Sequence, residues 1–251
     1  LGRISLVSEL GFLASLDLDW TIKNLISLFD WSNEAQALQV WQGYLVGIPH
    51  ESVLKYLNPL YEQAFDKLEL LDDSSSERFV HHIAVVCVYS KTTNPLEGGW
   101  LTHFLRKCNQ VNRILWADQI LREITKLDPD EKLRIWDKWI KQFLELRVDG
   151  IPKIDSDMEL ASFYQWAPNL GLAFPHIVEI LTTFAPPKFK NIRIFYYIIE
   201  NKLHQKFPDA TINLIAHVLN SHTYSMYSKD LLIIYSELKE LDISADKIRK
   251  L

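Results

Sequence analysis

The stretch "RIWDKWIKQFLELRVDGIP", residues 134–152, decides the fold class, because its apolar side chains recur at helical spacing. They form one stripe along a helix, while polar residues occupy most of the other faces. The stripe consists of Ile135, Trp136, Trp139, Ile140 and Phe143. Two tryptophans three residues apart could form a ligand platform. Since both fall on the apolar stripe, we predict instead that Trp136 and Trp139 are buried core residues.

Both ends of this helix are marked in the sequence. Asp128 is a good N-cap, Pro129 suits the first helical position, and Glu131 stands where a capping box has its glutamate. Gly150 can adopt the left-handed conformation that follows a helix end, and Pro152 prevents the helix from resuming. We therefore predict one helix that starts at residue 129 and ends before Gly150.

Similar patterns fill the rest of the chain, without an alternating strand pattern. Further helices are predicted at 32–45, 51–71, 79–89, 100–107, 111–127, 157–171, 176–185, 191–207, 208–220 and 229–241. Short connections make successive helices antiparallel neighbours, which stack into a solenoid. The sequence therefore predicts an all-α fold, an irregular HEAT-like α-solenoid of about twelve antiparallel helices.

Some local expectations accompany this fold. Pro59 should kink or split its helix near Asn58, because proline removes a backbone donor. Ser32 and Asp155 are the expected caps of the helices that follow them. Residues 79–89 contain enough β-branched side chains for a buried strand, but a lone strand has no partner here, so a helix is predicted.

The predicted domain organisation is a single helical-repeat domain over residues 1–251, with a possible subdivision near 186–190, in the Pro- and Lys-containing stretch APPKFKN. The sequence opens without an initiator Met, as if in the middle of an element. We therefore expect a fragment of a longer protein.

Composition limits the classes of function. The 251 residues carry a net charge of −5 with scattered basic residues, which disfavours a nucleic-acid binder. Only Cys87 and Cys108 occur, as expected of a reducing compartment, and we predict a cytoplasmic location. Since no apolar run approaches the roughly 20 residues of a membrane-spanning helix, no membrane partner is predicted.

Motifs for chemistry are weak. The eight histidines include no H-E-x-x-H, and the two cysteines do not make a C-x-x-C pair. Cys87 has apolar neighbours and is predicted to be a buried thiol, while Gly98 and Gly99 lack the Lys of a phosphate loop and indicate a turn. Paired carboxylates lie at helix starts or in loops, where capping and solvation explain them. We predict no catalytic, cofactor-binding or metal-binding residue, and no enzyme activity in this chain.

A stack of helices offers an extended surface to another protein. Aromatic and Met side chains outside the core stripes are the candidate anchors. The predicted partner-binding residues are Trp100, Tyr197, Tyr224, Met226 and Tyr227. The alternative is that these side chains cover neighbouring helix ends.

Four stretches carry a resemblance to a known family. They are "FDWSNEAQALQVWQGYL" (29–45), W-x-x-W-I-x-x-F-x-x-x-R-x-x-G-I-P (136–152), M-E-L-A-x-F-x-x-W-A-P-x-L-G (158–171) and F-P-H-I-V-E-I-L (174–181). Together they resemble an uncharacterised helical domain at the C-terminal end of bacterial proteins that carry a sirtuin-type module at their N-terminus. The resemblance covers residues 20–245, and its motifs are mainly tryptophans and helix caps.

In that family the sirtuin module is similar to NAD-hydrolysing effectors of anti-phage defence. The helical region is taken to restrain the effector and to sense a phage protein. The resemblance therefore implies a sensor and regulatory domain whose partner is a phage protein or its own effector domain, with homo-oligomers formed through the full-length protein. NAD would be the substrate of the sirtuin module. No catalytic residue is carried over, because the glycines and the catalytic histidine of the sirtuin have no counterpart here.

Two other classes stay open. A HEAT-like DNA-binding or DNA-processing protein needs a basic concave face for the duplex. A plain protein-interaction scaffold has the same fold but controls no effector.

Overall fold

The computed structural model describes residues 2–186, 193–220 and 228–240. Every regular element in these ranges is a helix, so the chain is all-α, as predicted. It divides into two compact units, residues 1–120 (unit 1) and 121–251 (unit 2). The boundary falls inside helix α8, Gln110–Lys126, and a subdivision near 186–190 stays a prediction. Because a regular helix crosses the boundary, no Gly- or Pro-rich break marks it in the sequence. A single continuous solenoid stays a prediction.

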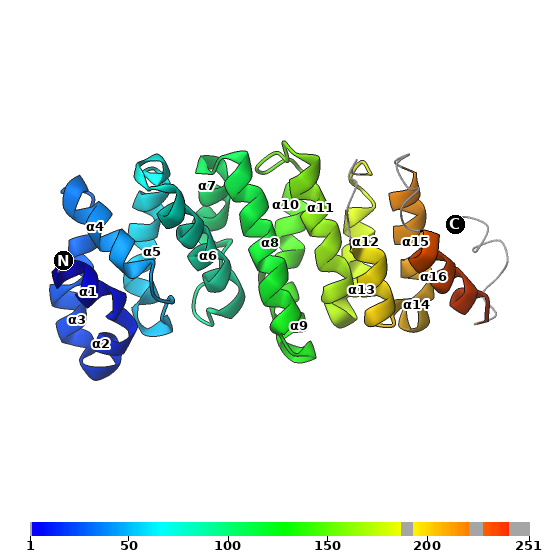
Figure 1. Ribbon diagram of the computed structural model, residues 1–251, viewed down its shortest axis with the longest axis horizontal. Helices are drawn as coiled ribbons and strands as arrows, with labels where there is room; N and C mark the ends of the chain where they lie inside the picture. The colour runs from blue at the N-terminus through cyan, green and yellow to red at the C-terminus, as the bar shows by residue number, and fades with distance from the viewer. Residues whose placement is uncertain (1, 187–192, 221–227, 241–251) are drawn as a thin grey trace. The chain divides into compact units, whose positions relative to one another are not determined.

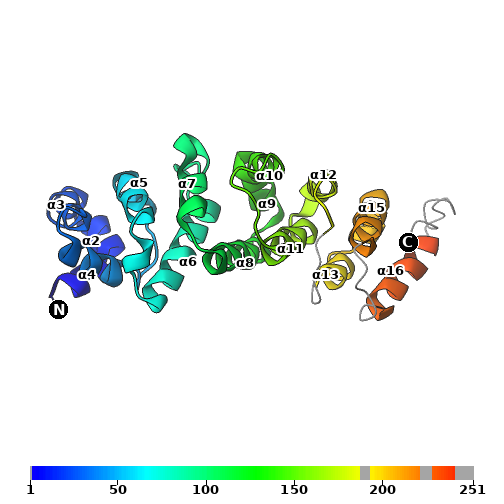
Figure 2. The same ribbon diagram turned by 90° about the horizontal axis from the view of Figure 1, so that it is seen from above.

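Unit 1 is built from seven helices and the first part of α8 in its described residues. They are α1 Gly2–Ser8, α2 Leu10–Leu16, α3 Leu18–Asn24, α4 Glu34–Tyr44, α5 Glu51–Phe65, α6 Asp73–Tyr89 and α7 Trp100–Lys107 (Figure 1). Helices α2, α3, α5 and α7 follow one another in one layer, and α4 and α6 lie in a second layer (Figure 2). Short 3-10 turns join several of them, at Ile26–Phe29, Leu68–Leu70 and Glu97–Gly99.

The core of unit 1 is a chain of aromatic rings between these layers. The Trp41 ring lies 5.1 Å from Phe29 and 5.0 Å from Tyr61, both edge to face. Edge-to-face contacts add to the stabilisation from burial alone. Trp100 belongs to this core, because it is only 4% exposed and its ring lies 5.2 Å from Phe65. The prediction that Trp100 is a surface anchor is therefore corrected: it begins α7 on the side that packs against α5.

Two local details of unit 1 differ from the expectations: α5 is not split at Pro59, and α4 has a different N-cap. Helix α5 continues through Pro59 without a break, because its buried side chains hold both halves against the core. The N-cap of α4 is Asn33, whose side chain accepts from the Gln36 amide at 3.2 Å. Ser32 instead hydrogen-bonds to Asp30. The helical prediction for residues 79–89 is confirmed, since they form the C-terminal part of α6.

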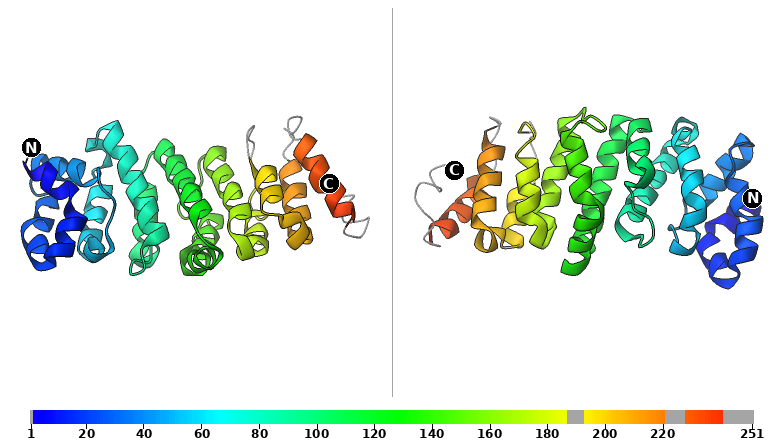
Figure 3. Two further views of the ribbon diagram at one scale, coloured as in Figure 1. Left: turned by 60° about the horizontal axis from the view of Figure 1, so that its bottom comes forward. Right: turned by 180° about the vertical axis from the view of Figure 1, so that it is seen from behind.

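Unit 2 contains the end of α8 and eight more helices in its described residues. They are α9 Pro129–Ile135, α10 Lys141–Val148, α11 Asp157–Trp166, α12 Phe174–Leu181, α13 Ile194–Glu200, α14 Leu203–Lys206, α15 Pro208–Leu219 and α16 Ser228–Glu240 (Figure 3). Helices α10, α12 and α15 form one row, with α12 in contact with both neighbours (Figure 2). Helices α11, α13 and α16 lie in the second layer. Two 3-10 turns, Ala167–Asn169 and Gly171–Ala173, link α11 to α12.

Residues 128–152 fold largely as predicted. Asp128 caps α9 by accepting from the Glu131 amide at 2.8 Å, and Pro129 is the first helical residue. The Glu131 carboxylate accepts from Arg134 Nε at 2.7 Å. Trp136 is 3% exposed and Trp139 is fully buried, so the core prediction for both is confirmed.

One feature of this stretch was missed: residues Trp136–Ile140 form a π-helical turn between α9 and α10. The buried positions here come in steps of four, at 135 and 136, 139 and 140, 143 and 144, and 147. In a regular α-helix, a step of four residues turns the stripe by about 40° each time. A wider turn with bonds from residue i to i+5 takes up this drift. The π turn therefore keeps the whole stripe on the core side.

A buried ion pair follows the π turn. Arg147 donates to Glu159 Oε1 on α11 and to the carbonyl of Pro152, and both charged side chains are excluded from solvent. The Arg147 guanidinium also lies 5.9 Å from the ring centres of Phe143 and Phe163. These contacts tie the end of α10, the turn after it and α11 together.

Two other predictions in unit 2 are wrong in detail. The cap of α11 is Ser156 rather than Asp155, and its hydroxyl accepts from the Met158 amide at 3.1 Å. The single helix expected at 191–207 is two helices, α13 and α14, separated at Lys202, which has a left-handed φ of 52°. Because lysine rarely adopts this conformation, the sequence carries no warning of the break.

Candidate functional site

Helix α12 lies between α10 and α15 in unit 2 and exposes one face to solvent. Its residues Phe174, Ile177 and Leu181 are buried, whereas Glu179 points outward and its side chain is 77% exposed. Pro175 in the first turn needs no backbone donor there, so the short helix starts cleanly. This pattern leaves a partly polar ridge with a hollow on each side.

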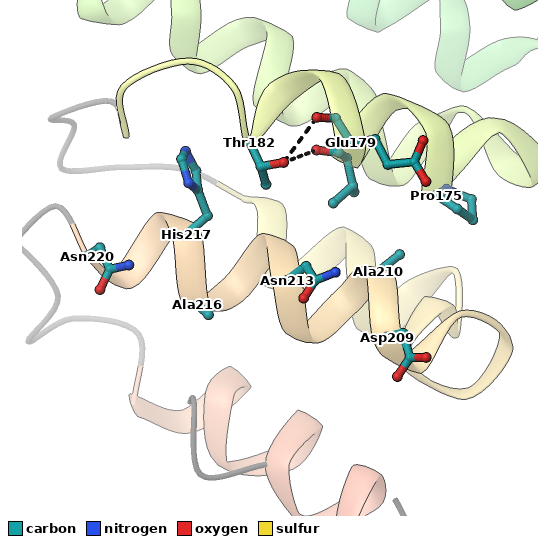
Figure 4. Close-up of a pocket in the computed structure, with 10 residues that line it drawn as sticks. Pro175, Glu179, Thr182, Asp209, Ala210, Asn213, Ala216, His217 and Asn220 are labelled. Carbon is teal, nitrogen blue, oxygen red and sulfur yellow. Dashed lines mark hydrogen bonds between the residues drawn. The ribbon is translucent and has the colours of Figure 1, made fainter. Parts of the chain in front are cut away.

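The first hollow, between α12 and α15, has a volume of about 470 Å³ and is open to solvent. Side chains from the two helices face each other across it (Figure 4). It is lined by Pro175, Val178, Glu179, Thr182, Asp209, Ala210, Asn213, Ala216, His217 and Asn220. Thr182 Oγ1 donates back to the carbonyls of Val178 at 2.9 Å and Glu179 at 3.1 Å. The outward polar groups are therefore mainly two carboxylates and two amides.

His217 closes one end of this hollow and is held from below. Its Nε2 lies 2.9 Å from the hydroxyl of Tyr164, which also donates to the carbonyl of Leu181 at 2.8 Å. The two rings are parallel within 4°, with centres 6.1 Å apart. Burial lowers the pKa of His217, against an opposing hydrogen bond to the Phe184 backbone. Burial therefore favours the uncharged form of His217, and Glu179 and Asp209 are the carboxylates that line this hollow.

The second hollow lies between α10 and α12 and has a volume of about 320 Å³. It is lined by Glu145, Val148, Asp149, Glu179, Ile180 and Thr183. Glu179 lines both hollows, so they form one site, which we call the paired clefts. Four carboxylates line the paired clefts, and among the described residues neither lining set contains a Lys or Arg. His176 Nδ1 is 3.9 Å from Glu179, but both groups are exposed, so the pair is weak.

In the part of the chain that the structure describes, no three His, Cys, Asp or Glu side chains form a group that could hold a metal ion. A close His–carboxylate pair does occur elsewhere in unit 2: His204 Nε2 lies 2.6 Å from Glu237 Oε2, which also accepts from Gln205 at 2.8 Å. It joins α14 to α16, and His204 is buried, so we interpret it as a structural contact.

The predicted anchor residues do not come together among the described residues. Tyr197 on α13 is half-buried, with its ring 5.4 Å from the exposed Tyr196, and it lies in unit 2. Trp100 is in the core of unit 1. Tyr224, Met226 and Tyr227 lie outside the described residues.

Sequence reasoning missed the carboxylates of the paired clefts. Glu145, Glu179 and Asp209 each occupy an outward position on its own helix, which the helical periodicity shows. Nothing in the pattern of one helix tells which outward residues of other helices lie beside it.

Comparisons of the chain with protein-family models, with curated proteins and with solved structures found no match. Within the described residues, none of the helices combines the length and apolar character that crossing a membrane requires.

Proposed function

We propose that this chain is a protein-recognition domain, the C-terminal sensor and regulatory domain of a NAD-hydrolysing sirtuin protein of anti-phage defence. It would bind a phage or partner protein in the cytoplasm and so control the effector. In this proposal the chain is not itself an enzyme, and NAD is the substrate of the sirtuin module.

The observation that carries the recognition role is the pair of clefts beside α12. Clefts lined by apolar walls and a few polar groups are the usual form of a binding site. Trp139, Phe143 and Trp166, which belong to the motifs of the family resemblance, pack ring against ring in the core of unit 2. The motifs therefore describe a scaffold, and the clefts are the surface that this scaffold presents.

Regulation adds one energetic requirement. A bound partner shifts an equilibrium between restrained and active states only by its difference in affinity for the two. We therefore expect the partner to contact the paired clefts in one state of the effector more extensively than in the other.

Site-specific crosslinking tests the recognition role. A photo-crosslinking residue replaces Asn213, which lines the first hollow, in the chain expressed in bacteria before phage infection. The matched control carries it at Thr125, an exposed position of α8. We expect a discrete protein adduct from position 213 only, appearing after infection. Equal adducts from both positions, or none from either, would contradict the proposal.

The charge of the clefts does not favour the DNA-processing alternative, since duplex DNA binds to basic surfaces. Salt-sensitive retention of the chain on heparin would revive that alternative. A plain scaffold predicts that charge reversal at Glu179 leaves the effector's NAD hydrolysis unchanged in the intact protein.

A further inference from the structure

The paired clefts have two independent properties, hollow shape and charge. The volume of each hollow is many times the roughly 30 Å³ that a water molecule occupies, so each hollow can hold a side chain. Glu179 and Asp209 line one hollow, and Glu145, Asp149 and Glu179 line the other. A ligand that fills both would place its atoms against carboxylates in each.

We propose that the paired clefts bind an extended, basic segment of the partner protein, with one Lys or Arg side chain in each hollow. This inference rests on the proposed function and specifies the chemistry of its partner. Glu179, which lines both hollows, would accept hydrogen bonds from both cations.

The walls fit long cationic side chains better than compact cations. Val148 and Ile180 line the second hollow, and Val178, Ala210 and Ala216 line the first. The methylene stems of Lys and Arg cover apolar surface of this kind while their charged ends reach polar groups. A guanidinium can also donate two parallel hydrogen bonds to one carboxylate.

Among the described residues, no Lys or Arg side chain lines either hollow, so the lining itself is acidic. Lys141 lies one turn before Glu145 on the outer face of α10, and His176 lies 3.9 Å from Glu179. Neither lines a hollow. The whole chain has five more acidic than basic residues, which also favours a negative charge.

The spacing of the hollows sets the spacing of the two cations. They lie on opposite sides of α12, and packed helices are about 8–10 Å apart. In an extended segment, side chains at i and i+2 point to the same side and are roughly 7 Å apart, while neighbours point to opposite sides. Flexible stems cover the remaining distance. The expected motif is therefore Arg-x-Arg, or the same with Lys.

Labelled peptides test this directly by fluorescence anisotropy. Two isomers of equal charge are compared, one with Arg-Ser-Arg and the other with Arg-Arg-Ser at the centre. We expect the Arg-Ser-Arg isomer to bind about two- to five-fold tighter, because only this isomer forms a second exposed ion pair. Equal affinity of the two isomers would overturn the proposed spacing.

Two variants locate the site. Glu179→Gln should weaken binding of the Arg-Ser-Arg peptide by roughly three- to ten-fold, because one carboxylate serves both cations. Glu62→Gln, at an exposed carboxylate in the last turn of α5, should leave binding unchanged. Circular dichroism checks that both variants fold. Equal weakening by both would mean general charge attraction and would overturn the inference.

The crosslinking experiment separates this inference from the proposed function. If the infection-dependent adduct at position 213 persists undiminished in Glu179→Gln, partner recognition stands but the basic-segment inference fails. If the wild-type chain gives no adduct although the peptides bind as expected, the proposed function fails and the chemistry of the clefts stands.

Discussion

Acidification should weaken unit 1 through one buried histidine. His82 on α6 is 1% exposed, and its Nε2 lies 3.0 Å from the carbonyl oxygen of Gly47. Because a carbonyl only accepts, Nε2 carries the proton, and Nδ1, 3.3 Å from the Tyr61 hydroxyl, is the unprotonated nitrogen. Burial lowers the pKa of His82 from 6.5 to about 4, with a smaller effect of the neighbouring His81 and an opposing one from the Gly47 hydrogen bond.

The sign and size of the effect follow from linkage. Below pH 6.5 the unfolded chain takes up a proton at His82, whereas the folded chain does not until about pH 4. The stability that the neutral form contributes is therefore complete above pH 6.5 and is lost as the pH falls toward 4. With about 1.4 kcal/mol for each pKa unit, the loss between pH 7 and pH 5 is about 2 kcal/mol.

The assay is urea unfolding at pH 7 and pH 5, followed by circular dichroism, for the wild-type chain and for His82→Gln. Glutamine can still donate to the Gly47 carbonyl but does not titrate. The wild-type free energy of unfolding should fall by about 2 kcal/mol more than that of the variant. If both fall by the same amount, His82 is not the group responsible and the reasoning is refuted.

Three substitutions test the packing by urea or thermal unfolding. Trp139→Ala should lower the free energy of unfolding by about 3–5 kcal/mol, because a fully buried aromatic side chain is removed; an unchanged midpoint would contradict the core assignment. Arg147→Met alone should lower the free energy of unfolding by about 3–5 kcal/mol, because it leaves the Glu159 charge buried without its partner. Adding Glu159→Leu should restore most of that stability. A double variant no more stable than Arg147→Met would show that the loss of the ion pair is not the cause. Gly43→Ala inside a helix would normally raise the free energy of unfolding by up to about 1 kcal/mol. Here the new Cβ would lie 2.7 Å from the Ile4 carbonyl oxygen, so we expect a lower melting temperature. A higher melting temperature would contradict the close packing of α1 on α4.

Much of the fold could be predicted from the sequence, because helix periodicity and caps are local. The start of α9 at Pro129, the left-handed Gly150 and the buried Trp139 all follow from residues within one or two turns. The break between α13 and α14 has no such local signal. A left-handed lysine at 202 ends α13, and nothing but the tertiary structure requires it there.

The candidate site could not be predicted, because its residues come from three helices. Glu145, Glu179 and Asp209 each look like an ordinary solvated residue on its own helix. The residues predicted as anchors were aromatic side chains and a methionine instead. Trp100 is a core residue because the hydrophobic effect buries large rings wherever a neighbouring helix covers them.

The π-helical turn at Trp136–Ile140 also bears on how this helix tolerates changes in length. A π turn accommodates one surplus residue, so the α-helical segments before and after it keep the relative phase of a helix that is one residue shorter. Removing the exposed Asp137 would therefore leave a regular α-helix whose two ends still face the core, whereas the same deletion one turn later, within α10, would rotate everything beyond it by about 100°. At the π turn, therefore, the helix tolerates the loss of one residue without changing which side chains face the core.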